Sequence, residues 1–129
     1  MTSKENVLEK VGSVSVEPVV KDKIDVTYFD LKPREKGWYE GKEIEAALPE
    51  KHLFSIAEVY GLIAALIAGQ AEGEEGILKN TGDYNLFYTE KFCVSVSWYS
   101  VHGYCHVRSW SRGEDWDGGV RVFSPGLES

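Results

Sequence analysis

The stretch that most constrains the fold runs from residue 91 to residue 112, where apolar and small polar residues alternate on both sides of His102-Gly103. Alternation with a period of two around a glycine-containing turn is typical of a β-hairpin. A two-residue turn at this pair would place Tyr99 opposite His106, because paired positions are counted outward from the turn. The segment therefore predicts two long antiparallel strands within a sheet-based fold.

The two faces of this predicted hairpin differ in composition. One face carries residues suited to a core: Phe92, Val94, Val96, Trp98, Cys105 and Val107. The other carries aromatic and basic side chains, of types enriched at interfaces, and we call it the hairpin face: Tyr99, Tyr104, His106, Arg108 and Trp110. We predict that the hairpin face binds a partner. The alternative is that another strand or the N-terminal segment covers it.

Length and charge narrow the class of partner. A chain of 129 residues fits one domain that buries its core without disulfide or metal support. The net charge of -7 and the sequence pI of about 5.0 disfavour a surface that binds duplex nucleic acid. Between residues 43 and 75 acidic side chains are frequent, and Lys51 is the only lysine or arginine. A basic protein partner is therefore favoured over nucleic acid.

The sequence also predicts a compartment. The N-terminus is polar and lacks the apolar segment of a signal peptide. The longest apolar run, Val59 to Ala68, is shorter than the roughly 20 residues of a membrane span. Cys93 and Cys105 would lie on opposite faces of the hairpin, beyond disulfide reach. We expect a soluble, cytoplasmic protein with free thiols and no membrane contact.

The order of patterns predicts an α+β domain. We expect a flexible N-terminal arm over residues 1–12, a single α+β domain over 13–125 and a disordered tail over 126–129. The predicted core of the domain is an antiparallel sheet of about six strands in ββ-α-ββββ order, with one apolar helix on one face.

The strands outside the main hairpin are predicted from shorter patterns. Residues 13–20 are expected to form an edge strand because Pro18 interrupts them, and residues 23–29 to form a stronger one. Residues 38–44 are expected to return as a further strand. Residues 77–79 and 85–88 flank an Asn-Thr-Gly-Asp turn and predict a second hairpin.

The helix is predicted over Ile56 to Ala68. Ser55 and Glu58 have the spacing of a capping box, in which both side chains bind backbone amides of the first turn. Phe54 and Val59 occupy the positions of a hydrophobic staple. Gly69 suits a left-handed residue just past the last turn.

One narrow stripe of this helix consists of small residues, while large apolar residues cover most of the remainder: Ala57, Gly61, Ala64 and Ala68. In the simpler interpretation these residues face solvent, where alanine is a good helix former. In the alternative the stripe packs against the same helix of a second subunit, which makes the protein a homodimer.

The residues that could carry chemistry do not form a catalytic or metal-binding pattern. Cys105 and His106 are adjacent in a strand, so they point to opposite faces and cannot act as nucleophile and base together. The possible zinc ligands are scattered across the hairpin rather than spaced for a zinc site: Cys93, His102, Cys105 and His106. The acidic loop at residues 114–118 lacks the alternating ligands of a calcium loop. We expect no enzyme activity, cofactor or metal.

One segment resembles a known family. Lys23 to Asp30, followed by the Lys- and Glu-rich loop up to Glu43, resembles the first strand and loop of the immunity proteins that neutralise ribosome-cleaving nuclease colicins. The resemblance implies a small acidic protein built on an antiparallel sheet with a short helix. It draws attention to Asp25 and Asp30 as exposed acids.

The sequence thus favours a small acidic, non-enzymatic protein-binding domain, with an inhibitor or immunity-type protein as its most concrete form. One alternative is a single-stranded nucleic-acid-binding protein that stacks bases on the hairpin face. Another is a phage-type structural or assembly protein that oligomerises through the helix.

Overall fold

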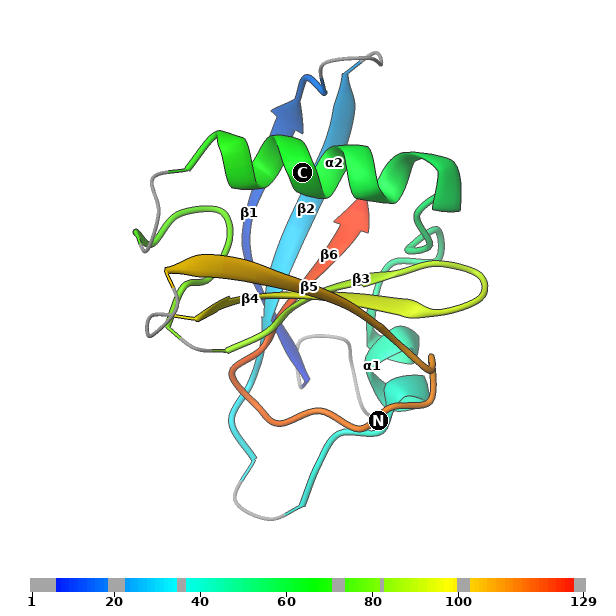
Figure 1. Ribbon diagram of the computed structural model, residues 1–129. Helices are drawn as coiled ribbons and strands as arrows, with labels where there is room; N and C mark the ends of the chain where they lie inside the picture. Colours follow the sequence, from blue (N-terminus) through cyan, green and yellow to red (C-terminus); the bar gives the residue numbers. More distant parts are fainter. Residues whose placement is uncertain are drawn as a thin grey trace.

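The computed structural model describes residues 7–18, 23–34, 37–70, 74–81, 83–99 and 103–126. These contain six strands and two helices in ββ-αα-ββββ order (Figure 1). The strands are β1 (Leu8–Val16), β2 (Ile24–Leu31), β3 (Asn85–Tyr88), β4 (Cys93–Tyr99), β5 (Tyr104–Trp110) and β6 (Arg121–Pro125). The helices are α1 (Gly41–Ala47) and α2 (Ile56–Ala68).

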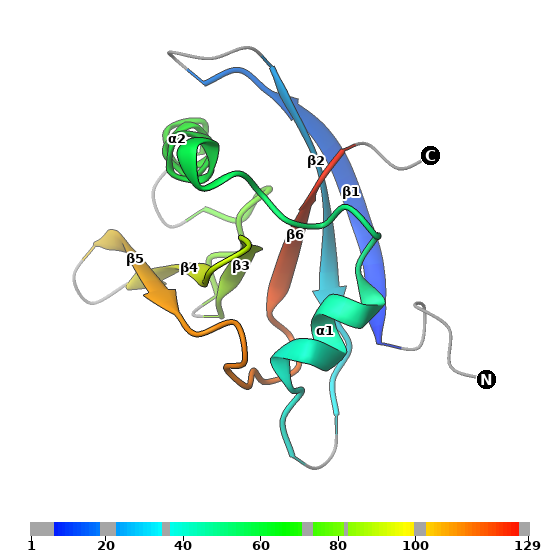
Figure 2. The same ribbon diagram turned by 90° about the vertical axis from the view of Figure 1, so that its right-hand side faces the viewer.

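All six strands belong to one sheet with the order β1-β2-β6-β3-β4-β5. Neighbouring strands are antiparallel except β3 and β6, which are parallel. The sheet twists so strongly that β5 runs across the direction of β2 (Figures 1 and 2). The α+β class is therefore confirmed, with a mixed sheet in place of a purely antiparallel one and one helix more than expected.

Each face of the sheet has its own apolar core, because side chains alternate between faces along each strand. On one face Val26, Phe87 and Phe123 pack with the apolar side of α2. On the other face Leu31 and Tyr88 pack with residues of α1 and of the loops. The central strand β3 is buried at all four positions, which explains its continuous run of Asn, Leu, Phe and Tyr.

The strand predicted at residues 38–44 is wrong. Only Tyr39 makes a bridge, with Trp116, and the chain then forms helix α1. Ile44 and Ala47 are buried while Lys42 is exposed, so the apolar residues recur with helical rather than strand spacing. So few apolar residues are compatible with the spacing of either a helix or a strand. The helix is the form that buries Ile44 and Ala47 in the core on this face of the sheet.

The second predicted hairpin is also wrong, because residues 77–79 do not form a strand. Strand β3 pairs instead with β4 and β6. The side chain of Asn85 supplies the bonds to the preceding segment: it accepts from the amide of Lys79 at 2.7 Å and donates to the Lys79 carbonyl at 2.9 Å. A buried side-chain amide thus replaces a strand ladder.

Helix α2 begins and ends at the predicted residues, but the capping interactions at its two ends differ from those predicted. Ser55 is the N-cap residue, yet its side chain makes no capping hydrogen bond. Gly69 has φ -82°, so the left-handed conformation expected there is wrong. The last turn is closed instead by the amide of Gly69, which donates to the Ala65 carbonyl at 3.0 Å.

Strand β1 begins inside the range assigned to the N-terminal arm. Leu8 is buried in the core beside Phe29 and Leu31, so its burial extends the domain to this residue. Residues 1–6, half of the predicted arm, and residues 127–129, most of the predicted tail, lie outside the described residues. Neither helix in the described part of the chain is long and apolar enough to cross a membrane.

Candidate functional site

Strands β4 and β5 form the predicted hairpin, but with the register shifted by two residues. Tyr99 lies opposite Tyr104, and Ser97 lies opposite His106. The predicted two-residue turn at His102-Gly103 is therefore replaced by a longer connection over residues 100–103, of which 100–102 lie outside the described residues. Because the shift is an even number, every side chain keeps its predicted face.

The hairpin face is partly displayed. Tyr104 is 48% exposed and Arg108 is exposed on the edge strand β5. His106 is half-buried, and its ring meets that of Tyr104 edge to face at 6.2 Å. The Tyr99 side chain is not among those the structure describes. Binding by the hairpin face stays a prediction.

Trp110 differs from the rest of the hairpin face because it is anchored. Its indole Nε1 donates to the hydroxyl of Ser95 at 2.8 Å. Its ring packs edge to face against Trp116 at 5.4 Å and Tyr84 at 6.4 Å. The Arg108 guanidinium lies over the ring, 4.6 Å from its centroid. Trp110 therefore joins the displayed surface to the core.

These three rings form walls of a pocket of about 330 Å³, which we call the acid-aromatic pocket. The rings meet at steep angles: 62° between Tyr84 and Trp116, 80° between Trp110 and Trp116, and 79° between Tyr84 and Trp110. The pocket is completed by one more tryptophan, one valine and four acidic residues: Trp38, Val120, Asp83, Glu114, Asp115 and Asp117.

The loop that connects β5 to β6 supplies most of the acids and is held closely against the chain before α1. The amides of Tyr39 and Trp116 each donate to the other residue's carbonyl at 2.9 Å. A side chain at Gly118 would lie 2.7 Å from the Lys32 carbonyl oxygen, and Gly119 has φ +95°. Only glycine fits such a close approach and such a backbone angle, which explains the Gly-Gly pair.

An ion-pair network fixes the start of the same loop. Glu45 of α1 accepts from the Arg112 guanidinium at 2.5 Å and lies 2.7 Å from His52 Nε2. Arg112 also donates to the Glu90 carbonyl at 2.8 Å. The hydrogen bond to Glu45 raises the pKa of Arg112 above its usual value. Helix α1, absent from the predicted fold, thus positions the acidic loop.

The charges around the pocket are mostly uncompensated. Asp83 pairs with Lys79 at 3.7 Å. Glu114, Asp115 and Asp117 form no ion pair with any residue that the structure describes. At the pocket's edge Trp38 is 59% exposed, more than any other large apolar side chain described. The pocket therefore presents aromatic surface and negative charge together.

Sequence reasoning missed this pocket. The acidic loop was considered as a calcium loop and rejected, and Trp38 was predicted to be part of a strand. A usable signal was present, because two tryptophans stand beside turn residues in Gly37-Trp38 and Asp115-Trp116-Asp117. Large aromatic residues in polar loops are common at binding surfaces. Only the fold brings these two loops together (Figure 1).

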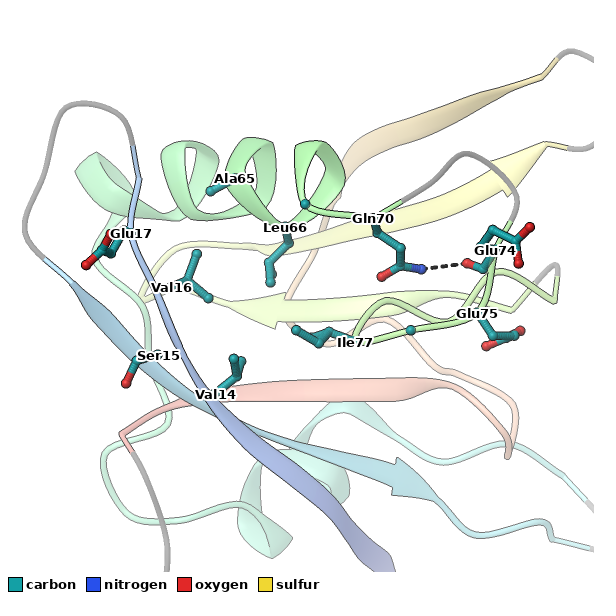
Figure 3. A pocket seen from close by; sticks show the side chains of 12 residues that line it. Val14, Ser15, Val16, Glu17, Ala65, Leu66, Gln70, Glu74, Glu75 and Ile77 are labelled. Atoms are coloured by element: carbon teal, nitrogen blue, oxygen red, sulfur yellow. Dashed lines mark hydrogen bonds between the residues drawn. The ribbon is translucent and has the colours of Figure 1, made fainter.

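A second, larger pocket of about 580 Å³ lies between β1 and the C-terminal end of α2 (Figure 3). Val14, Val16, Leu66 and Ile77 give it an apolar lining, and acids stand around it: Glu17, Glu74 and Glu75. The Gln70 amide spans one side, donating to the Glu74 carbonyl at 2.6 Å and to that of Leu78 at 2.8 Å. This pocket has an acidic rim but no aromatic lining.

Thiol chemistry is disfavoured at Cys93. Cys93 and Cys105 are unbridged and lie on opposite faces of the sheet. Burial raises the pKa of the Cys93 thiol well above its usual value, so the reactive thiolate is suppressed. Among the residues described, no group of three or more His, Cys, Asp or Glu side chains could hold a metal ion.

The two acids highlighted by the immunity-protein resemblance have different environments. Asp25 is exposed and accepts from the Ser15 hydroxyl at 2.5 Å. Asp30 is not a free surface acid: Arg121, which is buried, donates to its two oxygens at 2.7 and 3.2 Å. This pair holds β2 to β6, so the expectation of an exposed Asp30 is corrected.

The small-residue stripe of α2 lies on the outward side of the helix. Ala57, Gly61, Ala64 and Ala68 are all exposed, while Val59, Leu62, Ile63 and Leu66 are buried. A Cβ atom added at Gly61 would meet no atom within 4 Å outside the helix's own nearby backbone. Packing of the large residues on the sheet therefore agrees with the simpler interpretation, and the dimer contact stays a prediction.

Comparison with known proteins adds no relative. No family model matches the chain, and neither a curated protein nor a solved structure is significantly similar to it.

Proposed function

We propose that this protein is a small acidic, non-enzymatic binding domain whose partner is a basic protein, and that an inhibitor or immunity-type role is its most concrete form. The observation that carries the proposal is the acid-aromatic pocket. It combines the exposed ring of Trp38 with three acids that have no ion-pair partner in the described chain. The partner-facing surface consists of this pocket and the adjoining hairpin face.

Energetics support a protein partner over nucleic acid. Tryptophan, tyrosine and arginine dominate the binding energy of protein interfaces. Uncompensated carboxylates attract a basic partner and speed its association. The same carboxylates repel phosphates, whereas single-stranded nucleic acid needs a positive groove beside its stacking rings. The hairpin face contributes one arginine, Arg108, whereas four acidic residues line the adjoining pocket, so negative charge predominates on this surface.

Binding rather than catalysis is proposed because the buried Cys93 thiol is poorly suited to act as a nucleophile. The pocket offers carboxylates and rings but no thiol or histidine beside them. Such a lining suits recognition of a cationic surface.

The proposal is tested by comparing a lysine-rich peptide with oligothymidine of similar length, using fluorescence anisotropy at rising salt. The peptide is expected to bind and to weaken as salt increases, since exposed charges are screened. Trp38→Ala should weaken peptide binding by about 2 kcal/mol, the scale of an interface hot spot. Tyr60→Ala is the matched control, since Tyr60 is 46% exposed on α2, away from the pocket. Binding of oligothymidine without binding of the peptide would overturn the proposal.

A further inference from the structure

We infer that the acid-aromatic pocket receives the guanidinium group of one arginine side chain of the partner. The inference rests on the proposed function and specifies its central contact. It assigns a chemical class of ligand to this pocket, whereas the proposed function requires only that the surface attract a basic protein.

The aromatic lining of the pocket suits a cation. The rings of Tyr84, Trp110 and Trp116 pack edge to face on one another, with centroids 5.2 to 6.4 Å apart, and form one aromatic side of the pocket. The face of an aromatic ring carries partial negative charge and attracts a cation placed within about 6 Å of its centroid. Trp38, which lines the pocket and is 59% exposed, is therefore the ring most accessible to a cation.

The walls are rigid before any ligand arrives. Trp116 is only 5% exposed, and its backbone is paired with that of Tyr39. Trp110 is held by its hydrogen bond to Ser95. A site whose side chains are already ordered loses less conformational entropy on binding than a flexible one.

The electrostatics select a positively charged ligand. Glu114, Asp115 and Asp117 line the pocket, and none of them forms an ion pair within 4.0 Å with another residue that the structure describes. Two or more carboxylates around one space repel one another, and a cation between them relieves that repulsion. A neutral or anionic group would leave this repulsion in place.

Arginine is favoured over lysine because its guanidinium is planar, is weakly hydrated and donates hydrogen bonds in a fork that matches a carboxylate. The protein's own arginines already stack in this way close by. Arg34 lies 3.7 Å from the centroid of Tyr39, and Arg108 lies 4.6 Å from that of Trp110. Neither arginine lines the pocket itself.

The test uses three lysine-rich peptides that differ at one central position, which holds arginine, lysine or citrulline. Citrulline keeps the shape of arginine without its charge. By isothermal titration calorimetry with the full chain, the arginine peptide should bind about tenfold more tightly than the citrulline peptide, a ratio between those of exposed and desolvated cation-π contacts. The lysine peptide should lie between them.

Two charge-matched variants locate the effect. E114Q/D115N/D117N should abolish the preference for arginine, whereas E17Q/E74Q/E75Q, which removes as many charges from the pocket of Figure 3, should retain it. Tight binding of all three peptides to the wild type with no preference would overturn the guanidinium site and leave the proposed function standing. Failure of every peptide to bind would overturn the proposed function itself. A lysine peptide that binds as tightly as the arginine peptide would also overturn the inference.

Discussion

The indole nitrogen of Trp110 donates to the hydroxyl of Ser95 across strands β5 and β4, at 2.8 Å. Ser95 is almost fully buried, so this bond satisfies a hydroxyl inside the sheet with a group that also lines a surface pocket. A residue that the alternation assigned to a displayed face is therefore part of the scaffold as well. Any account of binding by Trp110 must separate these two roles.

Trp110→Ala should destabilise the protein by about 2 kcal/mol or more, because it removes ring packing against Trp116 and leaves Ser95 without its donor. Trp110→Phe should keep most of the packing and cost about 1 kcal/mol for the lost hydrogen bond. Arg108→Ala, at an exposed position, should change stability by less than about 0.5 kcal/mol. Urea unfolding measures all three. Equal stability of Trp110→Ala and the wild type would show that the ring is not part of the core.

Ser55→Ala should cost less than about 0.5 kcal/mol, although Ser55 is the N-cap residue of α2. Its hydroxyl makes no capping bond, so the usual loss of about 1 kcal/mol is not expected. Thr89→Ala is the contrasting variant, since the buried Thr89 hydroxyl accepts from the amide of Phe92 at 3.0 Å and donates to its carbonyl at 2.9 Å. It should cost about 1–3 kcal/mol. Equal losses from both substitutions in urea melts would contradict this assignment.

Stability should fall at alkaline pH. Burial raises the pKa of Cys93 and of Tyr88, so the folded state holds these protons more tightly than the unfolded state. Their contribution is complete below the ordinary pKa values, about 8.5 for a thiol and 10 for a tyrosine, and is lost as pH rises above them. The urea concentration at the midpoint of unfolding, measured under reducing conditions, should therefore decrease above about pH 8.5 because of the thiol, and more steeply above about pH 10 because of the tyrosine. Cys93→Ala should flatten the first part of this decrease; an unchanged profile would contradict the assignment to the thiol.

The exposed stripe of α2 makes a dimer testable without damage to the fold. Gly61→Leu should be tolerated by the single chain, because Gly61 is exposed and a Cβ added there meets no atom within 4 Å. If α2 packs against a second copy, this substitution should weaken the dimer in sedimentation equilibrium, whereas Gly61→Ala should preserve it. If the wild-type chain sediments as a monomer at high concentration, the dimer contact is wrong and the stripe is ordinary solvent-exposed surface.

The elements that could be predicted from the sequence are those with an unambiguous period. The main hairpin alternates over many residues, so its faces were correct although its register shifted by two. Helix α2 has a long apolar run between Ser55 and Gly69, and its bounds were correct. Helix α1 was mistaken for a strand because Ile44 and Ala47 give too few apolar positions to separate the two periods.

The two tryptophan-containing turns are visible in the sequence, but their assembly into one pocket could not be predicted because the parts are distant in the chain. Trp38, Tyr84 and Trp116 lie in separate loops, and their approach depends on the Tyr39-Trp116 bridge and on the Glu45-Arg112 ion pair. Neither contact has a local pattern. The parallel pairing of β3 with β6 could not be predicted for the same reason, because the two strands are more than thirty residues apart in the sequence.

The most direct test of the central claim uses the four tryptophans as probes. Each indole N-H gives a signal in a two-dimensional ¹⁵N NMR spectrum, and a tryptophan-to-phenylalanine variant assigns each one. Trp38, Trp110 and Trp116 line the acid-aromatic pocket, whereas Trp98 lies on the opposite face of β4. On titration with the arginine-containing peptide, the signals of Trp38, Trp110 and Trp116 should shift together with one affinity, while that of Trp98 stays in place. A peptide that binds while shifting only Trp98, or none of the four, would contradict the claim that this pocket is where a basic partner docks.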